Sequence, residues 1–223
     1  MKKLTIVTIL ALLMIFSSCS NETNSKDNFE IISSNVTIVE DSPNVYTIIL
    51  ASEVSNSTKK PLHFIESNFD IVDENGTLIE TMELVNAYPP VVKTGKIAVY
   101  YGAVVSNKIS DTTTKLEAIP HIESKKSKLE GEALGIMGAT TGASSFASGI
   151  VQNASSRTTY NNVHIAVISR KTDGEVVSVM TTTVDSVKPR EEIPFEVRDL
   201  VGERDLGANE PSGYSLLAYI DPK

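Results

Sequence analysis

The chain has 223 residues and a formal net charge of −8, from 28 acidic and 20 basic side chains. This excess of acidic groups argues against a nucleic-acid partner, because binding to phosphates requires a basic surface. Tryptophan is absent and aromatic residues are few, so a stacking platform for sugars or bases is not expected. Valine, isoleucine, threonine and serine are abundant, and these residues favour strands over helices.

The first 18 residues have the order of a secretory signal peptide. Lys2 and Lys3 precede the apolar run Leu4–Phe16, and small serines follow it. The run is shorter than the roughly 20 residues that span a bilayer. The alternatives are an ordinary signal that is cleaved after a small residue, and an uncleaved anchor helix. We predict that residues 1–18 are a signal peptide.

Cys19 is the only cysteine, so it cannot form a disulfide within the chain. Its place directly after Phe16-Ser17-Ser18 resembles the lipobox of bacterial lipoproteins, although Phe16 stands where leucine is usual. The resemblance implies cleavage just before Cys19, whose sulfur then carries diacylglycerol, with or without a further N-acyl chain. Two long chains anchor a protein stably, because each buried CH₂ contributes about 0.8 kcal/mol. Residues 19–28 are then a flexible tether at the bacterial cell membrane or outer membrane, outside the cytoplasm.

Residues 29–115 are expected to form a first β domain. Asn35–Glu40 and Val45–Asn56 are strand-like and flank an Asp-Ser-Pro-Asn segment that favours a turn. Asn75-Gly76 is the signal of a tight hairpin turn. Further strand-like runs are Phe64–Asp73, Thr77–Leu84 and Ile97–Val105.

Residues 116–142 differ in character from the strands before them. Glu123–Lys128 is charged, and the apolar residues that follow, from Leu129 to Met137, have a loosely helical spacing. Glycines then accumulate among small residues, which lowers the stability of a helix. We predict a short helix or a Gly-rich linker here.

Residues 143–223 repeat the order of the first half at an offset of 95 to 98 residues. Val54-Ser55-Asn56-Ser57 corresponds to Val151-Gln152-Asn153-Ala154, and Val92-Lys93-Thr94-Gly95 corresponds to Val187-Lys188-Pro189-Arg190. Chance similarity among Val- and Ser-rich strands is the alternative to a true repeat. Short strands separated by turns predict two tandem Ig-like β-sandwich domains, without the Cys…Trp…Cys core of antibody domains.

Phe69-Asp70-Ile71-Val72-Asp73, followed by Asn75-Gly76, resembles the signature of the FxLYD-type domains of bacterial surface proteins. The second half keeps Asn153 and Asp173-Gly174, but it has Ile165-Ala166-Val167-Ile168-Ser169 in place of the signature. The resemblance implies a small Ig-like sandwich of the kind found in lipoproteins and envelope proteins. It brings no catalytic residues.

Candidate metal ligands are sparse. His63, His121 and His164 show no one-turn helical spacing, and there is no cysteine pair to complete a zinc site. The acidic run Asp70–Asn75 lacks the residue order of an EF-hand, and turn chemistry accounts for the residues before Gly76. No metal site is therefore predicted.

Catalytic and cofactor motifs are missing too. The segment Gly135–Gly142 lacks the Gly-Lys-Ser/Thr ending of a phosphate-binding loop and the βαβ unit of a dinucleotide fold. No Gly-x-Ser-x-Gly elbow occurs. We predict no catalytic residue, no enzyme activity, and no cofactor apart from the lipid on Cys19.

These observations predict a lipid-anchored envelope protein that acts as a non-catalytic binding or structural module. Its expected partner is an envelope protein or a cell-wall component, which an exposed edge strand can recruit by strand addition. The alternative is a solute-binding or enzymatic lipoprotein with a site at the junction of the halves, near the glycine-rich segment 131–149.

Overall fold

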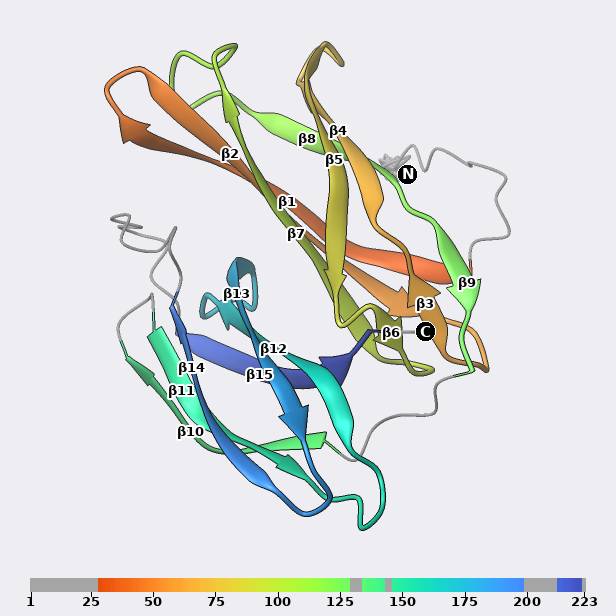
Figure 1. Ribbon diagram of the computed structural model, residues 1–223. Helices are drawn as coiled ribbons and strands as arrows, with labels where there is room; N and C mark the ends of the chain where they lie inside the picture. Colours follow the sequence, from red (N-terminus) through yellow and green to blue (C-terminus); the bar gives the residue numbers. More distant parts are fainter. Residues whose placement is uncertain (1–27, 129–133, 143–145, 199–211, 222–223) are drawn as a thin grey trace, which may run out of the picture.

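The computed structural model describes residues 28–128, 134–142, 146–198 and 212–221, and every regular element in these ranges is a β-strand (Figure 1). The expected all-β class is therefore confirmed. The strands of the first half are β1 (Phe29–Ser42), β2 (Val45–Asn56), β3 (Leu62–Phe64), β4 (Ser67–Asp73), β5 (Leu78–Tyr88), β6 (Val91–Val92), β7 (Ile97–Ser106), β8 (Leu116–His121) and β9 (Ser124–Lys126). Those of the second half are β10 (Leu134–Gly142), β11 (Phe146–Asn153), β12 (Tyr160–Arg170), β13 (Val176–Val187), β14 (Glu192–Arg198) and β15 (Gly213–Ile220).

The first half is built on a six-stranded antiparallel sheet in the order β1-β2-β7-β5-β4-β8. The sheet curls until β1 lies beside β8, so that it resembles a nearly closed barrel (Figure 1). Side chains alternate between the two faces of a strand. In β1 and β2, Val36, Ile38, Ile48 and Leu50 therefore all point into the core.

One end of this core is covered by the small sheet β6-β3-β9. Phe64 of β3 is buried there, and its ring meets those of Phe29 and Tyr100 edge-on, with centroids 5.6 and 6.2 Å apart. The buried Tyr100 hydroxyl donates to the Ile65 carbonyl at 2.9 Å and accepts from Ser67 Oγ at 3.1 Å. The polar end of the tyrosine is thus satisfied inside an apolar core.

The second half consists of two three-stranded sheets, β10-β11-β14 and β13-β12-β15. Both contribute to one core, in which Val151 and Phe195 of the first sheet pack with Val163, Ile165 and Val187 of the second. This arrangement follows from the apolar alternation within β11, β12 and β14.

Of the short helix or Gly-rich linker expected within 116–142, the helix is absent from the described part of that segment, so that alternative was wrong. Leu116–His121 pairs with β4, Ser124–Lys126 pairs with β3, and Leu134–Gly142 pairs with β11. Leu134 and Ile136 both pack against the core of the second half. Their spacing of two residues is that of a strand, and the pairing with β11 gives it a buried face.

The two halves contact each other through a small apolar cluster. Ala51 and Val99 lie on the outer face of the first sheet, opposite Ile168 of β12 and Val176 of β13. Ala51, Val99 and Ile168 each lie next to a core residue of their own half, so alternation along the strand places them on the outer face. The sheet β13-β12-β15 therefore faces the first half.

The signal peptide, Cys19 and the tether up to residue 27 lie outside the described residues. In the described ranges, no helix is both long and apolar enough to cross a membrane.

Candidate functional site

An ion pair beside the apolar cluster fixes the contact between the halves. Arg170 Nη2 at the end of β12 lies 2.6 Å from Glu53 Oε1 of β2, and the two side chains are 25% and 12% exposed. Ser33 Oγ donates to the other Glu53 oxygen at 3.1 Å, and Arg170 Nη1 donates to the Gly174 carbonyl at 2.8 Å. Because the pair is largely shielded from water, its geometry restricts how the halves can move relative to each other.

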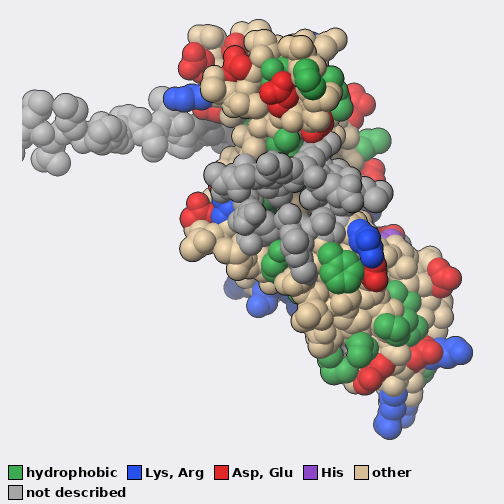
Figure 2. Space-filling view, turned by 90° about the vertical axis from the view of Figure 1, so that its left-hand side faces the viewer, with side chains coloured by type: hydrophobic (Ala, Val, Ile, Leu, Met, Phe, Trp, Pro, Cys, Tyr) green, Lys and Arg blue, Asp and Glu red, His purple; other side chains and the backbone are tan. Residues whose placement is uncertain are grey.

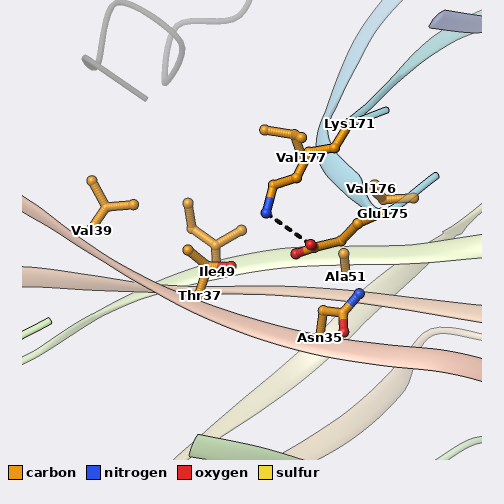
Figure 3. Close-up of a pocket in the computed structure, with 9 residues that line it drawn as sticks. All are labelled: Asn35, Thr37, Val39, Ile49, Ala51, Lys171, Glu175, Val176 and Val177. Carbon is orange, nitrogen blue, oxygen red and sulfur yellow. Dashed lines mark hydrogen bonds and ion pairs between the residues drawn. The ribbon is translucent and has the colours of Figure 1, made fainter. Parts of the chain in front are cut away.

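A narrow cleft lies next to this contact (Figure 3). The hairpin turn from β12 to β13 faces the outer side of β1 and β2, and the Lys171–Glu175 ion pair within that turn, 2.8 Å long, borders the cleft (Figure 3). The free volume of the cleft is about 20 Å³, the space of a single water molecule. The cleft is lined by Asn35, Thr37, Val39, Ile49, Ala51, Lys171, Glu175, Val176 and Val177. It is too small for an organic ligand.

A second, roomier cleft at the junction has a volume of about 240 Å³. Strand β5 and the residues after it form one wall, and β12, β13 and β15 form the other. The lining residues are Asn86, Ala87, Tyr88, Pro90, His164, Thr181, Tyr219 and Asp221. Most of these side chains carry a hydrogen-bonding group, so the cleft suits a polar ligand better than an apolar one.

His164 is the centre of the polar groups in this second cleft. Its Nε2 lies 3.0 Å from Asp221 Oδ2 and its Nδ1 lies 3.1 Å from Thr183 Oγ1. Its ring stacks on that of Tyr219, with centroids 5.4 Å apart. Burial, followed by the nearby Tyr88 and Asp221, raises the pKa of Tyr219 well above its usual value, so its hydroxyl stays protonated.

Hydroxyl, imidazole and carboxylate follow one another here in the order of a hydrolytic triad. The strand register gives a simpler explanation, because Thr183 and Tyr219 lie directly opposite His164 in the two neighbouring strands, and the carboxylate of Asp221 comes two residues after Tyr219. Cross-strand neighbours interact in this way in any antiparallel sheet. We therefore assign no catalytic role to the group.

Neither of the other two histidines lines the cleft around His164. His121 Nε2 lies 2.9 Å from Asp70 Oδ2 on the exposed face of the first half, and this hydrogen bond lowers the pKa of Asp70. His63 lies in β3, where burial lowers its pKa. Among the described residues, no three His, Cys, Asp or Glu side chains gather as metal ligands would.

In the acidic run before Gly76, Asp73 forms hydrogen bonds within its own turn. Asp73 Oδ1 accepts from the backbone N–H groups of Asn75 and Thr77, both at 2.8 Å. Gly76 has a φ of 78°, which glycine adopts without strain. The carboxylate therefore stabilises the hairpin between β4 and β5.

The glycine-rich segment, expected near a junction site, contributes no described residue to either cleft. Its described parts form β10 and β11, which pair with each other and with β14. At Gly149, an added Cβ would lie 3.0 Å from the Phe195 ring and 3.3 Å from the Met137 carbonyl oxygen. This glycine allows close packing of strand against side chain.

Two buried asparagines that the predicted repeat aligns have matching surroundings. Asn56 Nδ2 donates to the carbonyls of Lys60 and Val92, both at 2.8 Å. Asn153 Nδ2 donates to those of Thr158 at 2.7 Å and Val187 at 3.0 Å.

The backbones of the two asparagines match as well. The Asn56 carbonyl accepts from Gly95 N–H, and the Asn153 carbonyl accepts from Arg190 N–H. Gly95 and Arg190 have similar positive φ angles, 68° and 60°. Each asparagine therefore connects the end of its own strand, through hydrogen bonds, to the turn that precedes another strand.

No protein-family model matches this chain, and no curated protein resembles it closely enough in sequence to count as a relative. Arguments about its function therefore start from the sequence signals and the geometry above.

Proposed function

We propose that the chain is a lipid-anchored protein of the bacterial cell envelope whose folded body is a non-catalytic binding or structural module. The observation that carries the proposal is the position of Cys19. This sole cysteine follows a basic start and the apolar run Leu4–Phe16, and a short polar stretch separates it from β1. A tether of this kind holds a folded body at a membrane surface.

The body itself is proposed to be a pair of related Ig-like β-sandwich units of the FxLYD type. The matching hydrogen bonds of Asn56 and Asn153 support this proposal, because unrelated sheets have no reason to share them. The turns agree too: Gly76 N–H donates to the Asp73 carbonyl, as Gly174 N–H donates to that of Lys171.

The electrostatics favour a protein or cell-wall partner over nucleic acid. On the face drawn in Figure 2, acidic side chains lie over both halves, and basic ones are scattered instead of gathered in one patch. On this face, phosphates would meet no continuous basic surface, and the net charge of −8 also opposes their binding.

The mass of the native protein tests the anchor. The full-length gene is expressed in a bacterium, and the product is extracted with detergent and weighed intact beside the variants Cys19→Ala and Ser20→Ala. We expect the mass of residues 19–223 plus two or three acyl chains, retained in Ser20→Ala and lost in Cys19→Ala. An unmodified mass that begins near residue 19 would show a secreted, unanchored protein and refute this part of the proposal.

The cleft around His164 favours a second candidate function, the binding of a small polar solute. Two tyrosines, a histidine and a carboxylate converge there from both halves. Mass spectrometry of the denatured purified protein is expected to release such a molecule, and Tyr219→Ala to abolish its retention. If the protein carries nothing, and titration with polar metabolites leaves its tyrosine fluorescence unchanged, this second function is wrong.

A further inference from the structure

Strand β5 changes its partner along its length. Its first part pairs with β4, where Ser67 lies opposite Val85 and Phe69 lies opposite Met82. Two residues of β5, Glu83 and Leu84, thus face the single residue between Ser67 and Phe69, which is a β-bulge. Beyond the bulge, the last residues of β5 pair with Val99–Tyr101 of β7.

Leu84, at the bulge, combines two unfavourable properties. Its φ is 55°, in the left-handed region, and its side chain is 65% exposed. Asparagine, aspartate and glycine adopt this conformation more readily than leucine does. The other described non-glycine residues with positive φ are polar: Asn44, Asn162 and Arg190. Neither the backbone conformation of the bulge nor the packing of the core therefore requires leucine at this position. Residues with strained backbones of this kind concentrate at functional sites.

The change of partner leaves a short stretch of β7 with a free edge, bounded by the pairing at Tyr101 and by the hydrogen bonds of Ser106 and Lys108 to Glu80 and Ile79 of β5. Gly102–Val105 pair with β2 on one side, whereas on the other side the pairing with β5 ends at Tyr101. In an antiparallel strand, every second residue turns its N–H and C=O away from a given neighbour. No strand in the described part of the chain takes up these groups along Gly102–Val105. Val105 is also 63% exposed.

Between the diverging strands lies a groove of about 240 Å³, here called the β5–β7 groove. Met82 and Val85 are buried beneath it. An added Cβ on Gly102 would lie 3.3 Å from Val85, so this glycine lets the buried Val85 side chain lie close to β7. The lining residues are Thr81, Met82, Glu83, Leu84, Val85, Asn86, Tyr101, Gly102, Ala103 and Val104.

We propose that the β5–β7 groove binds an extended, basic segment of a partner protein, which adds to β7 as a further strand. The free edge of β7 supplies the backbone hydrogen bonds, and Leu84 and Val105 cover alternate side chains of the segment. Glu83 is the one charged side chain among the described lining residues, and the whole chain carries −8. The charge therefore selects lysine or arginine in the segment. This inference rests on the binding role proposed above, and it is independent of the lipid anchor.

The test uses a fluorescent nine-residue peptide that alternates valine and threonine and has a lysine at each end. Binding to the purified full-length protein in detergent is followed by fluorescence anisotropy. Two control peptides have a central proline, which cannot pair as a strand, or glutamates in place of the lysines. We expect the lysine peptide to bind at least about tenfold more tightly than either control.

Variants of the protein locate the site. We expect Leu84→Asn and Val105→Asn each to weaken binding about tenfold, and Glu83→Lys to reverse the preference between the lysine and glutamate peptides. Leu78→Asn is the matched control, because Leu78 lies on the same strand, is 53% exposed and is not among the lining residues. The thermal midpoint of Leu84→Asn is expected to equal or exceed that of the native protein, so lost binding cannot be attributed to unfolding.

Three results would overturn the proposal. The first is equal binding of the lysine and proline peptides. The second is binding that Leu84→Asn and Val105→Asn leave unchanged. The third is a concentration-dependent dimer that Leu84→Asn dissociates in sedimentation experiments, which would show that a second copy of the chain occupies the groove. None of these results bears on the mass of the lipidated protein, so the anchor is tested separately.

Discussion

Asn56 and Asn153 hold equivalent positions in the two halves: each buried side-chain amide donates to the carbonyl of a valine, Val92 at 2.8 Å and Val187 at 3.0 Å. In each half, the valine precedes a tight turn whose N–H donates back to the asparagine carbonyl. A buried polar side chain is tolerated because these bonds satisfy it, and removing it leaves buried carbonyls without donors.

Asn56→Ala and Asn153→Ala are therefore each expected to lower the free energy of unfolding by about 2–3 kcal/mol. Urea titration followed by circular dichroism measures the change. Asn161→Ala is the control, because Asn161 is exposed in β12, and its unfolding midpoint should match that of the native protein. If one asparagine proves dispensable and the other does not, the two positions are not equivalent.

The sequence was most informative where local chemistry determines structure. The Asn-Gly turn, the strand-like runs and the correspondence of the two asparagine segments could all be read from residue types and spacing. The run Phe64–Asp73, expected as one strand, is divided between β3 and β4, which belong to different sheets. The division depends on the partners of each strand, which the run itself does not specify.

Contacts between residues distant in the sequence could not be predicted. Glu53 and Arg170 are two charged residues among many, and only the packing of the halves brings them together. The groove beside β7 arises in the same way, because it depends on where β5 leaves β4. The bulge at Leu84 has no sequence signal, since leucine is a poor choice for its conformation.

The Glu53–Arg170 pair is expected to couple the halves during unfolding. Glu53→Gln leaves the guanidinium of Arg170 without its carboxylate in a largely buried contact, which should cost about 1–3 kcal/mol. Calorimetry should then show the two halves melting separately instead of together. The matched control is Glu196→Gln, because Glu196 pairs with Arg198 at 2.8 Å but the two side chains are 53% and 72% exposed. That control should change stability by less than about 0.5 kcal/mol, and an equal effect of both substitutions would argue against coupling.

Asp73 should make the stability of the first half depend on pH. Hydrogen bonds from the backbone of Thr77, and then of Asn75, lower the pKa of its carboxyl below the usual value. Because the folded pKa is the lower one, this stabilisation is fully present above the unfolded pKa, about 3.9, and is lost as pH falls through the folded pKa. The thermal midpoint of the native protein should therefore fall as the pH drops below about 4, and it should fall less steeply in Asp73→Asn, which keeps the acceptor oxygen without the charge. Identical pH profiles for the two proteins would assign the acid sensitivity to other groups.

Gly149 and Gly135, both in the glycine-rich segment, should respond differently to the same substitution. An added Cβ at Gly149 lies 3.0 Å from two ring carbons of Phe195 and 3.3 Å from the Met137 carbonyl oxygen, which belongs to the backbone. Gly149→Ala is therefore expected to destabilise the second half by about 1–3 kcal/mol. An added Cβ at Gly135 meets nothing within 4 Å, and its φ is not positive.

Gly135→Ala should consequently be neutral or raise stability by up to about 1 kcal/mol, since alanine restricts the unfolded chain. Urea unfolding of both variants, monitored by near-ultraviolet circular dichroism of the tyrosines, measures the difference. Gly149→Ala with native stability would mean that the Phe195 ring can move aside, and the close packing of β11 against β14 would then not explain the glycine. A loss in Gly135→Ala equal to that in Gly149→Ala would instead indicate that the segment needs glycine for backbone freedom along its whole length.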